Sequence, residues 1–261
     1  SGETADTLAA LRDAKSQGIK TLAIVNVVGS SIAREADNVF YTLAGPEISV
    51  ATTKAYSTQL IAGYLLALQF AKARNEITDE RYTELLGEIF TIPDKIEKIL
   101  QDKERIQWYA HKLINVKDAF FIGRGIDYAI GMEGSLKLKE IAYIHSEAYA
   151  AGELKHGPIS LIEEGTLVVA VATVDELFDK TMSNVKEVKA RGADVFGVTT
   201  EKYREEIKKT ITSAVTVPET LPLLQPSLTI IPLQLFAYYV ALLRGCDVDK
   251  PRNLAKSVTV E

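Results

Sequence analysis

The feature that most constrains the fold of this chain is an internal repeat. Residues 59–64 align with residues 234–239 at an offset of 175. At an offset of 174, a helix followed by Gly18 and the strand 21–25 matches the helix 179–190, Gly192 and the strand 194–198. A duplicated α/β domain produces a repeat of this kind. We therefore expect an α/β fold with two similar domains, each with a mainly parallel sheet.

Short apolar runs that end in polar turns predict buried parallel strands. Residues 21–28 form such a run before Gly29-Ser30-Ser31, and residues 39–42 repeat the signal weakly. The second half of the chain begins with a predicted strand at 119–122, a glycine turn at 123–125 and a helix at 130–143. Three more predicted strands follow at 167–172, 194–198 and 214–217. This alternation predicts βαβ units.

Charged amphipathic helices at 77–117, which follow a long apolar helix at 53–73, separate the two halves. We predict a first domain at 1–80, connecting helices at 81–117, a second domain at 118–245 and a C-terminal tail at 246–261. The first domain has no counterpart of the opening at 119–143, so we expect it to be truncated at its N-terminus. Residues outside the sequence, or another segment, would have to complete it.

Composition excludes several classes of partner. The net charge of -5 provides no basic field for a nucleic-acid backbone. The single cysteine, Cys246, cannot form an intrachain disulfide, and no cysteine–histidine spacing predicts a zinc site. We expect no metal, no cofactor and a reducing, cytoplasmic compartment. The apolar run 228–243 is interrupted by Pro232 and Gln234, so we predict a core helix and no membrane span, and residues 1–6 lack the pattern of a signal peptide.

Two segments carry hydroxyl or charged groups at helix positions. Ser1-Gly2-Glu3-Thr4 precedes a helix, where free backbone N–H groups favour a phosphate, although a serine or threonine there can simply cap the helix. Glu133, Lys137 and Glu140 lie at i, i+4 and i+7 on one helix face that follows the glycine turn at 123–125. Ligands of open α/β sheets bind near such turns, whereas the alternative is ordinary surface ion pairing.

Two further segments offer a base and an amine. His156 lies in a small-residue loop at 148–158 and could titrate near neutral pH, or could merely be hydrogen-bonded in that loop. Lys256 lies in a tail with little periodic pattern, and such tails usually fray. Lys256 could serve as a Schiff-base nucleophile only if the tail folded over a crevice of the sheet.

These segments together resemble a known family. The matching motifs are SGETADT, VATTKAY, GSLKLKE, EAYAAGELKHGP and PRNLAKSVTVE, at residues 1–7, 50–56, 134–140, 147–158 and 251–261. The chain resembles the isomerase half of the glutamine–fructose-6-phosphate aminotransferases, also called glucosamine-6-phosphate synthases. That resemblance implies two sugar-isomerase (SIS) domains, each a flavodoxin-like three-layer αβα sandwich with a mainly parallel sheet. It also implies that ammonia from an N-terminal glutaminase domain aminates fructose 6-phosphate to glucosamine 6-phosphate, with glucose 6-phosphate as a further ligand.

The resemblance also implies roles for single residues. Ser1, Gly2 and Thr4 would hold the phosphate together with a preceding Ser-Gln pair of the family. Val50, Thr52 and Ala255 would contact the sugar, and Thr52 keeps the hydroxyl of the serine that is usual there.

In the mechanism that the resemblance implies, His156 of a neighbouring subunit assists ring opening and Lys256 forms an imine. Glu140 then moves a proton between C1 and C2, while Lys137 and Glu133 orient hydroxyls and charge. The chain is expected to form a homodimer or a higher homo-oligomer. Two alternatives remain at this point, which are a regulatory module that binds sugar phosphates without catalysis and a plain aldose–ketose phosphate isomerase.

Overall fold

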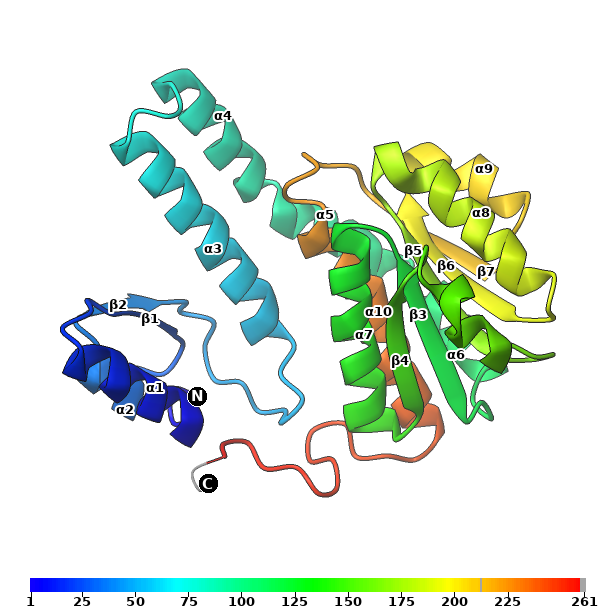
Figure 1. Cartoon of the computed structure of the whole chain (residues 1–261), viewed down its shortest axis with the longest axis horizontal. Helices are drawn as coiled ribbons and strands as arrows, with labels where there is room; N and C mark the ends of the chain where they lie inside the picture. Colours follow the sequence, from blue (N-terminus) through cyan, green and yellow to red (C-terminus); the bar gives the residue numbers. More distant parts are fainter. Residues whose placement is uncertain (212, 259–261) are drawn as a thin grey trace. The chain divides into compact units, whose positions relative to one another are not determined.

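The computed structural model describes residues 1–211 and 213–258 (Figure 1). The chain divides into two compact units, one made of Ser1–Leu86 and Asp249–Glu261 and the other of Gly87–Val248, which we call unit 1 and unit 2. The division falls inside helix α4 (Asp79–Phe90). The segment predicted as connecting helices, 81–117, therefore lies mainly with unit 2, and the tail from Asp249 onward lies with unit 1.

Unit 1 contains a two-stranded parallel sheet and helices that range from five to 20 residues. Its elements are α1 (Ala5–Ser16), β1 (Leu22–Val25), α2 (Ser31–Glu35), β2 (Asn38–Tyr41) and α3 (Lys54–Ala73). Leu22 of β1 pairs in register with Asn38 of β2, and Val25 pairs with Tyr41. Ala23, Val25 and Ile32 form its small buried cluster. The expected parallel α/β arrangement is present in this unit.

Unit 2 contains a five-stranded parallel sheet flanked by helices. After α4 its elements are α5 (Ile92–Gln101), α6 (Lys103–Lys112), β3 (Asp118–Gly123), α7 (Ile126–Ala142), β4 (His145–Ala150), η1 (Leu154–His156), η2 (Pro158–Leu161), β5 (Leu167–Ala172), η3 (Asp175–Leu177), α8 (Phe178–Lys189), β6 (Asp194–Thr200), η4 (Glu201–Tyr203), α9 (Arg204–Lys208), β7 (Ser213–Val217) and α10 (Pro226–Leu243). The strand order is β4-β3-β5-β6-β7, and each neighbouring pair is parallel.

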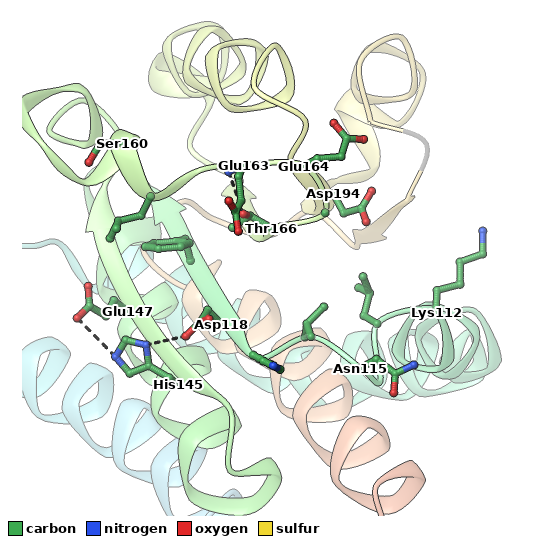
Figure 2. A pocket seen from close by; sticks show the side chains of 16 residues that line it. Lys112, Asn115, Asp118, His145, Glu147, Ser160, Glu163, Glu164, Thr166 and Asp194 are labelled. Carbon is green, nitrogen blue, oxygen red and sulfur yellow. Dashed lines mark hydrogen bonds and ion pairs between the residues drawn. The ribbon is translucent and has the colours of Figure 1, made fainter.

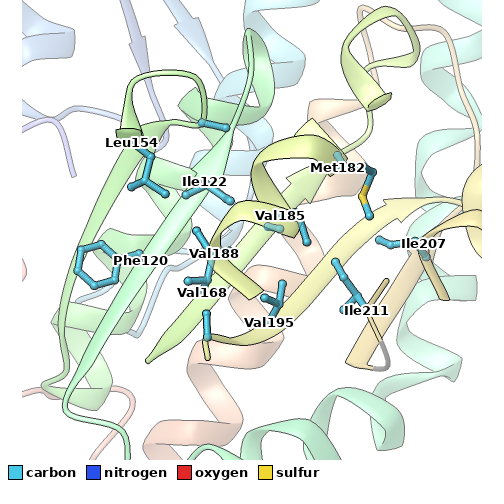
Figure 3. Close-up of a cluster of buried hydrophobic side chains, with 14 of the residues drawn as sticks. Phe120, Ile122, Leu154, Val168, Met182, Val185, Val188, Val195, Ile207 and Ile211 are labelled. Atoms are coloured by element: carbon cyan, nitrogen blue, oxygen red, sulfur yellow. The ribbon is translucent and has the colours of Figure 1, made fainter. Parts of the chain in front are cut away.

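The sheet of unit 2 is covered on both faces, which explains its continuously apolar strands. On one face, side chains of β3, β5 and β6 pack against α8 and α9, and Figure 3 shows Val168 and Val195 beside Val185 and Val188. On the other face, Phe196 stacks on Phe236 of α10 with ring centroids 4.9 Å apart. Unit 2 is therefore the three-layer αβα sandwich expected from the sequence.

Helix α10 is the core helix that the sequence predicts. By length and composition it could cross a membrane, but 67% of its 18 residues are buried inside the protein. It packs against α6 and α7, as Figure 1 shows. Pro232 lies within the helix and is itself buried. Burial of this kind is typical of the central helix of a globular domain.

One prediction about secondary structure was wrong. Residues 148–150 were expected in a loop, but they end strand β4, which pairs with β3 from Asp118↔His145 to Gly123↔Ala150. β4 lies at one edge of the sheet, and its polar sequence HSEAYA offers no apolar run to reveal it.

The internal repeat is visible in the order of elements. Helix α1, strand β1, helix α2, strand β2 and helix α3 recur in the same order as α8, β6, α9, β7 and α10. Both β1–β2 and β6–β7 are parallel pairs. Helices α1 and α8, which the repeat aligns, are followed by Gly18 and Gly192. Both glycines adopt a positive φ, 74° at Gly18 and 90° at Gly192.

Candidate functional site

The segment before α1 is a tight turn built on Gly2. Gly2 has φ 76°, and a Cβ there would lie 2.2 Å from Ser30 Oγ, so only glycine fits. The Gly2 carbonyl accepts a hydrogen bond from the Ile32 amide at 3.1 Å, and the Ser31 amide donates to Glu3 Oε1 at 2.8 Å. This hydrogen bond and the Ser31 side chain lower the pKa of Glu3.

The hydroxyls of this turn are not used as a helix cap. Thr4 occupies the N-cap position of α1, but its side chain makes no capping hydrogen bond. Ser1 Oγ accepts only a long contact from the Glu3 amide, at 3.4 Å. The capping alternative therefore does not describe Thr4. Backbone N–H groups at a helix N-terminus favour an anion, and a hydroxyl that does not cap the helix can add a hydrogen bond to it.

Hydrogen bonds between described residues attach the C-terminal tail to the rest of unit 1. The Val50 amide donates to the Asp249 carbonyl at 2.9 Å, and the Ala5 amide, in the first turn of α1, donates to the Val258 carbonyl at 2.9 Å. Between them the exposed Lys256 ammonium donates to the Ser49 carbonyl. The tail does not fray over these residues. Its course brings Lys256, and with it Ala255, to the turn that carries Val50 and Thr52.

That turn has a strained backbone at a predicted sugar contact. Thr52 has φ 48°, which is uncommon for a β-branched residue. Its hydroxyl donates to the Val50 carbonyl at 3.1 Å. Strain of this kind persists where the surrounding structure fixes the backbone, and it is often found at ligand-binding sites.

In unit 2, α7 brings the three predicted charged residues into one cluster. Lys137 Nζ lies 2.6 Å from Glu140 Oε2 and 3.4 Å from Glu133 Oε1. The Lys137 side chain is only 5% exposed, whereas exposed lysines are the rule on helix surfaces. Burial raises the pKa of Glu133, and the Lys137 charge offsets part of that rise. The alternative of ordinary surface ion pairing therefore does not describe this cluster.

The position of α7 is fixed by contacts on other sides of the helix. Ser135 and Ser146 are buried and lie 2.9 Å apart through their hydroxyls, and Ser146 Oγ also donates to the Ser135 carbonyl at 2.8 Å. Gly134 packs so tightly that a Cβ there would lie 2.8 Å from Leu233 Cδ1. These contacts hold Lys137 in place from both β4 and α10.

The cluster does not lie where the sequence placed it. The helix begins just after the carboxyl end of β3, but at 1.5 Å per residue Glu133 and Glu140 lie roughly 10 Å and 21 Å further along it. The carboxylate at that strand end is Asp127, which sequence analysis missed. It is 2% exposed and accepts hydrogen bonds from the amides of Thr173 and Val174 at 2.7 and 3.2 Å.

His156 is exposed in η1 of unit 2. Its amide donates to the Glu153 carbonyl at 3.0 Å. Among the described residues, no hydrogen bond or ion pair joins its imidazole to Glu133, Lys137 or Glu140. One chain therefore leaves this histidine available to another molecule.

A cavity of about 800 Å³ opens at the amino ends of the strands in the sheet of unit 2 (Figure 2). It is lined by the amino ends of β3, β5 and β6 at Asp118, Thr166 and Asp194, and His145 lies 3.2 Å from Asp118 at its rim. None of the predicted site residues lines it. Since ligands of such sheets bind at the carboxyl ends of the strands, we assign no substrate to this cavity.

Comparison with known proteins gives consistent results. A family model described as the SIS domain matches residues 1–69 and 112–244. The glutamine–fructose-6-phosphate aminotransferase [isomerizing] of Clostridium tetani is 60% identical over all 261 residues, and the chain spans 43% of that protein's length.

Solved structures agree. The C-terminal domain of glucosamine-fructose-6-phosphate aminotransferase from Francisella tularensis superposes with a TM-score of 0.91 and 41% identity, covering 96% of this chain and 71% of that one. A glucosamine-6-phosphate deaminase from Thermotoga maritima superposes with a TM-score of 0.75 and 26% identity, covering 98% and 72% of the two chains.

Proposed function

The chain belongs to the SIS domain family and to the C-terminal part of the glutamine–fructose-6-phosphate aminotransferases, and on that premise we propose that it converts fructose 6-phosphate and ammonia to glucosamine 6-phosphate. The ammonia would come from an N-terminal glutaminase domain of the whole enzyme. The reaction needs an amine for an imine, a base for a C1–C2 proton transfer and a grip on the phosphate.

The observation that carries the proposal is the attachment of the tail to unit 1. Lys256 donates to the Ser49 carbonyl, and the tail continues to the first turn of α1, where Val258 accepts from Ala5. An amine, the turn with the predicted sugar contacts and the N-terminus of α1 thereby lie in one unit. A phosphate bound by Ser1, Gly2 and Thr4 would anchor the ketose beside Lys256.

The chemistry begins at the ketone. The unprotonated Nζ of Lys256 adds to C2 of the open-chain sugar, and loss of water gives an imine. Ammonia then adds to C2 and displaces the lysine amine, which leaves an imine that carries the new nitrogen. Transfer of one proton from C1 to C2, together with passage of the C1 hydroxyl proton to the nitrogen, converts that imine to the amino aldose, so no oxidant or reductant is needed.

Glu140 is the proposed base for the proton transfer, which is worth roughly 10²–10⁴-fold in rate. Its carboxyl lies 2.6 Å from the buried Lys137 ammonium, a contact that holds the side chain in place. Glu133 is the second carboxyl beside Lys137, and burial raises its pKa. Lys137 and Glu133 would orient the hydroxyls of the sugar and the charge that develops on it.

His156 is proposed to assist ring opening in the site of a neighbouring subunit of a homo-oligomer. Its exposure on η1 supports this role. Mixing inactive His156→Ala subunits with inactive Glu140→Gln subunits should restore activity, because some mixed sites contain both wild-type residues. Mixed oligomers that stay inactive would place His156 and Glu140 in sites of the same chain.

The main experiment traps the imine in the full-length enzyme. Reduction with borohydride in the presence of fructose 6-phosphate should add the sugar to the tail peptide that contains Lys256, as read by mass spectrometry. The Lys256→Ala enzyme should lose both this adduct and amination, while sugar-phosphate binding stays measurable. Lys20→Ala, which removes an exposed lysine of unit 1, is the matched control and should retain the adduct. An adduct on another lysine would contradict the proposal.

The base has a separate test. Glu140→Gln should stop exchange of the C1 hydrogens with solvent without abolishing the Lys256 adduct, and exchange at the wild-type rate would exclude Glu140. Product analysis with and without ammonium separates the proposed activity from the two alternatives. A plain isomerase would form an aldose phosphate without nitrogen, and a binding module would form no product.

A further inference from the structure

The internal repeat relates the opening of α1 in unit 1 to the opening of α8 in unit 2. Because the offset is 174, Ser1 corresponds to Asp175 and Thr4 corresponds to Phe178. The unit 2 counterpart therefore has no hydroxyls at these positions. Asp175 instead forms an ion pair with Lys202 at 2.5 Å.

The two residues before this counterpart hold the buried carboxyl of Asp127. Thr173 and Val174, which directly follow β5, donate their amides to Asp127 Oδ2 at 2.7 and 3.2 Å, and the Thr173 hydroxyl donates to Oδ1. Thr229 of α10 donates to the Thr173 hydroxyl at 3.5 Å. Two successive amides and a hydroxyl that converge on the two oxygens of one carboxyl are the donors with which loops of this kind bind an oxyanion.

The location of Asp127 is also that of a ligand site. The strand order β4-β3-β5-β6-β7 is the flavodoxin-like order. In this order β4 is added on one side of β3 and the later strands are added on the other side, so the strand order reverses between β3 and β5. Ligands of such sheets bind outside the carboxyl ends of the strands at this reversal. Asp127 follows β3, and its partners follow β5, so its carboxylate occupies this position.

We propose that Thr173 and Val174 form an oxyanion site that Asp127 fills as an internal ligand, which closes unit 2 to phosphates. The site takes a small oxyanion such as formate or inorganic phosphate once the Asp127 carboxylate is removed. The analogy with Ser1 and Thr4 rests on the proposed function, whereas the contacts of Asp127 do not.

The test measures thermal unfolding of the chain by circular dichroism in chloride, formate and phosphate at equal ionic strength and pH. The midpoint of Asp127→Ala should rise in formate and phosphate by about 2–4 °C when the anion exceeds its dissociation constant tenfold. Wild type should show no such rise. Asp179→Ala, which removes an exposed carboxylate from the first turn of α8, should behave like wild type.

An Asp127→Ala protein whose midpoint responds to formate and phosphate no more than wild type would overturn the proposal. If this variant does not fold in chloride, its recovery on refolding from urea is compared in formate and in chloride. Greater recovery in formate supports the site, and equal recovery overturns it. Imine trapping at Lys256 is independent of both readouts, so failure of this inference and failure of the proposed function are distinguishable.

Discussion

Two glycines of α7 should respond to alanine with opposite signs. Gly134 and Gly131 both lie inside the helix, where alanine is favoured by about 0.5–1 kcal/mol. At Gly131 the nearest atom to an added Cβ would be Phe121 Cβ at 3.6 Å, an ordinary contact. At Gly134 the new atom would lie 2.8 Å from Leu233 Cδ1 and 3.0 Å from Phe121 Cε1. The neighbours of Gly134 must therefore shift, and overpacking of this kind costs about 1–3 kcal/mol.

The difference between the two variants isolates packing, because the helix preference is common to both. Gly131→Ala should raise the free energy of unfolding by about 0.5–1 kcal/mol. The free energy of unfolding of Gly134→Ala should be lower than that of Gly131→Ala by about 1–3 kcal/mol. Urea unfolding followed by circular dichroism measures both values. If Gly134→Ala proved as stable as Gly131→Ala, α7 would not be held as tightly against β3 and α10 as we infer.

Two other groups give predictions with a pH dependence. Lys137→Met should lose about 3–5 kcal/mol of unfolding free energy at pH 8, because two partly buried carboxylates lose their buried cation. The loss should be smaller at pH 5, because the raised pKa of Glu133 lets that carboxyl take up a proton more readily than an ordinary glutamate. Equal losses in urea unfolding at both pH values would contradict this. The pKa of Glu88 is lowered, first by the hydrogen bond from Lys95 and then by that from Thr220, so its folded form releases its proton more readily than its unfolded form. The stabilisation by Glu88 is present above the ordinary glutamate pKa and is lost as pH falls through the lowered one. Glu88→Gln should therefore be less stable than wild type at pH 6, with a gap that closes toward pH 3 in urea unfolding, and a constant gap would refute the assignment.

Much of the fold follows from local sequence. Strands β3, β5 and β6 are buried on both faces, so they appear as uninterrupted apolar runs with polar ends. The cluster on α7 was predictable because i, i+4 and i+7 always share a helix face. What spacing does not show is burial, since Lys137 on an exposed face would have the same pattern.

The features that sequence analysis missed depend on contacts between distant residues. Asp127 is an acidic residue in the first turn of a helix, a common pattern, and its partner Thr173 lies 46 residues away. The tail is held by backbone groups of Val50 and Ala5 and by the Ser49 carbonyl, and backbone groups have no residue-specific pattern. Strand β4 is at the edge of the sheet, where polar side chains are tolerated and an apolar run is not required.

Helix α7 shows why the charged cluster can be both buried and well positioned. Asp127 ties the first turn to the end of β5, Ser135 ties the middle to Ser146 of β4, and Gly134 lets Leu233 of α10 approach closely. Each contact involves a different neighbour, so no single displacement of the helix preserves all three. Movement of Lys137 relative to the sheet therefore requires breaking buried hydrogen bonds at about 0.5–1.5 kcal/mol each. Polar residues on several faces would weaken an ordinary core helix. In α7, Asp127 and Ser135 instead fix the helix and so hold the charged side chains that the proposed chemistry needs.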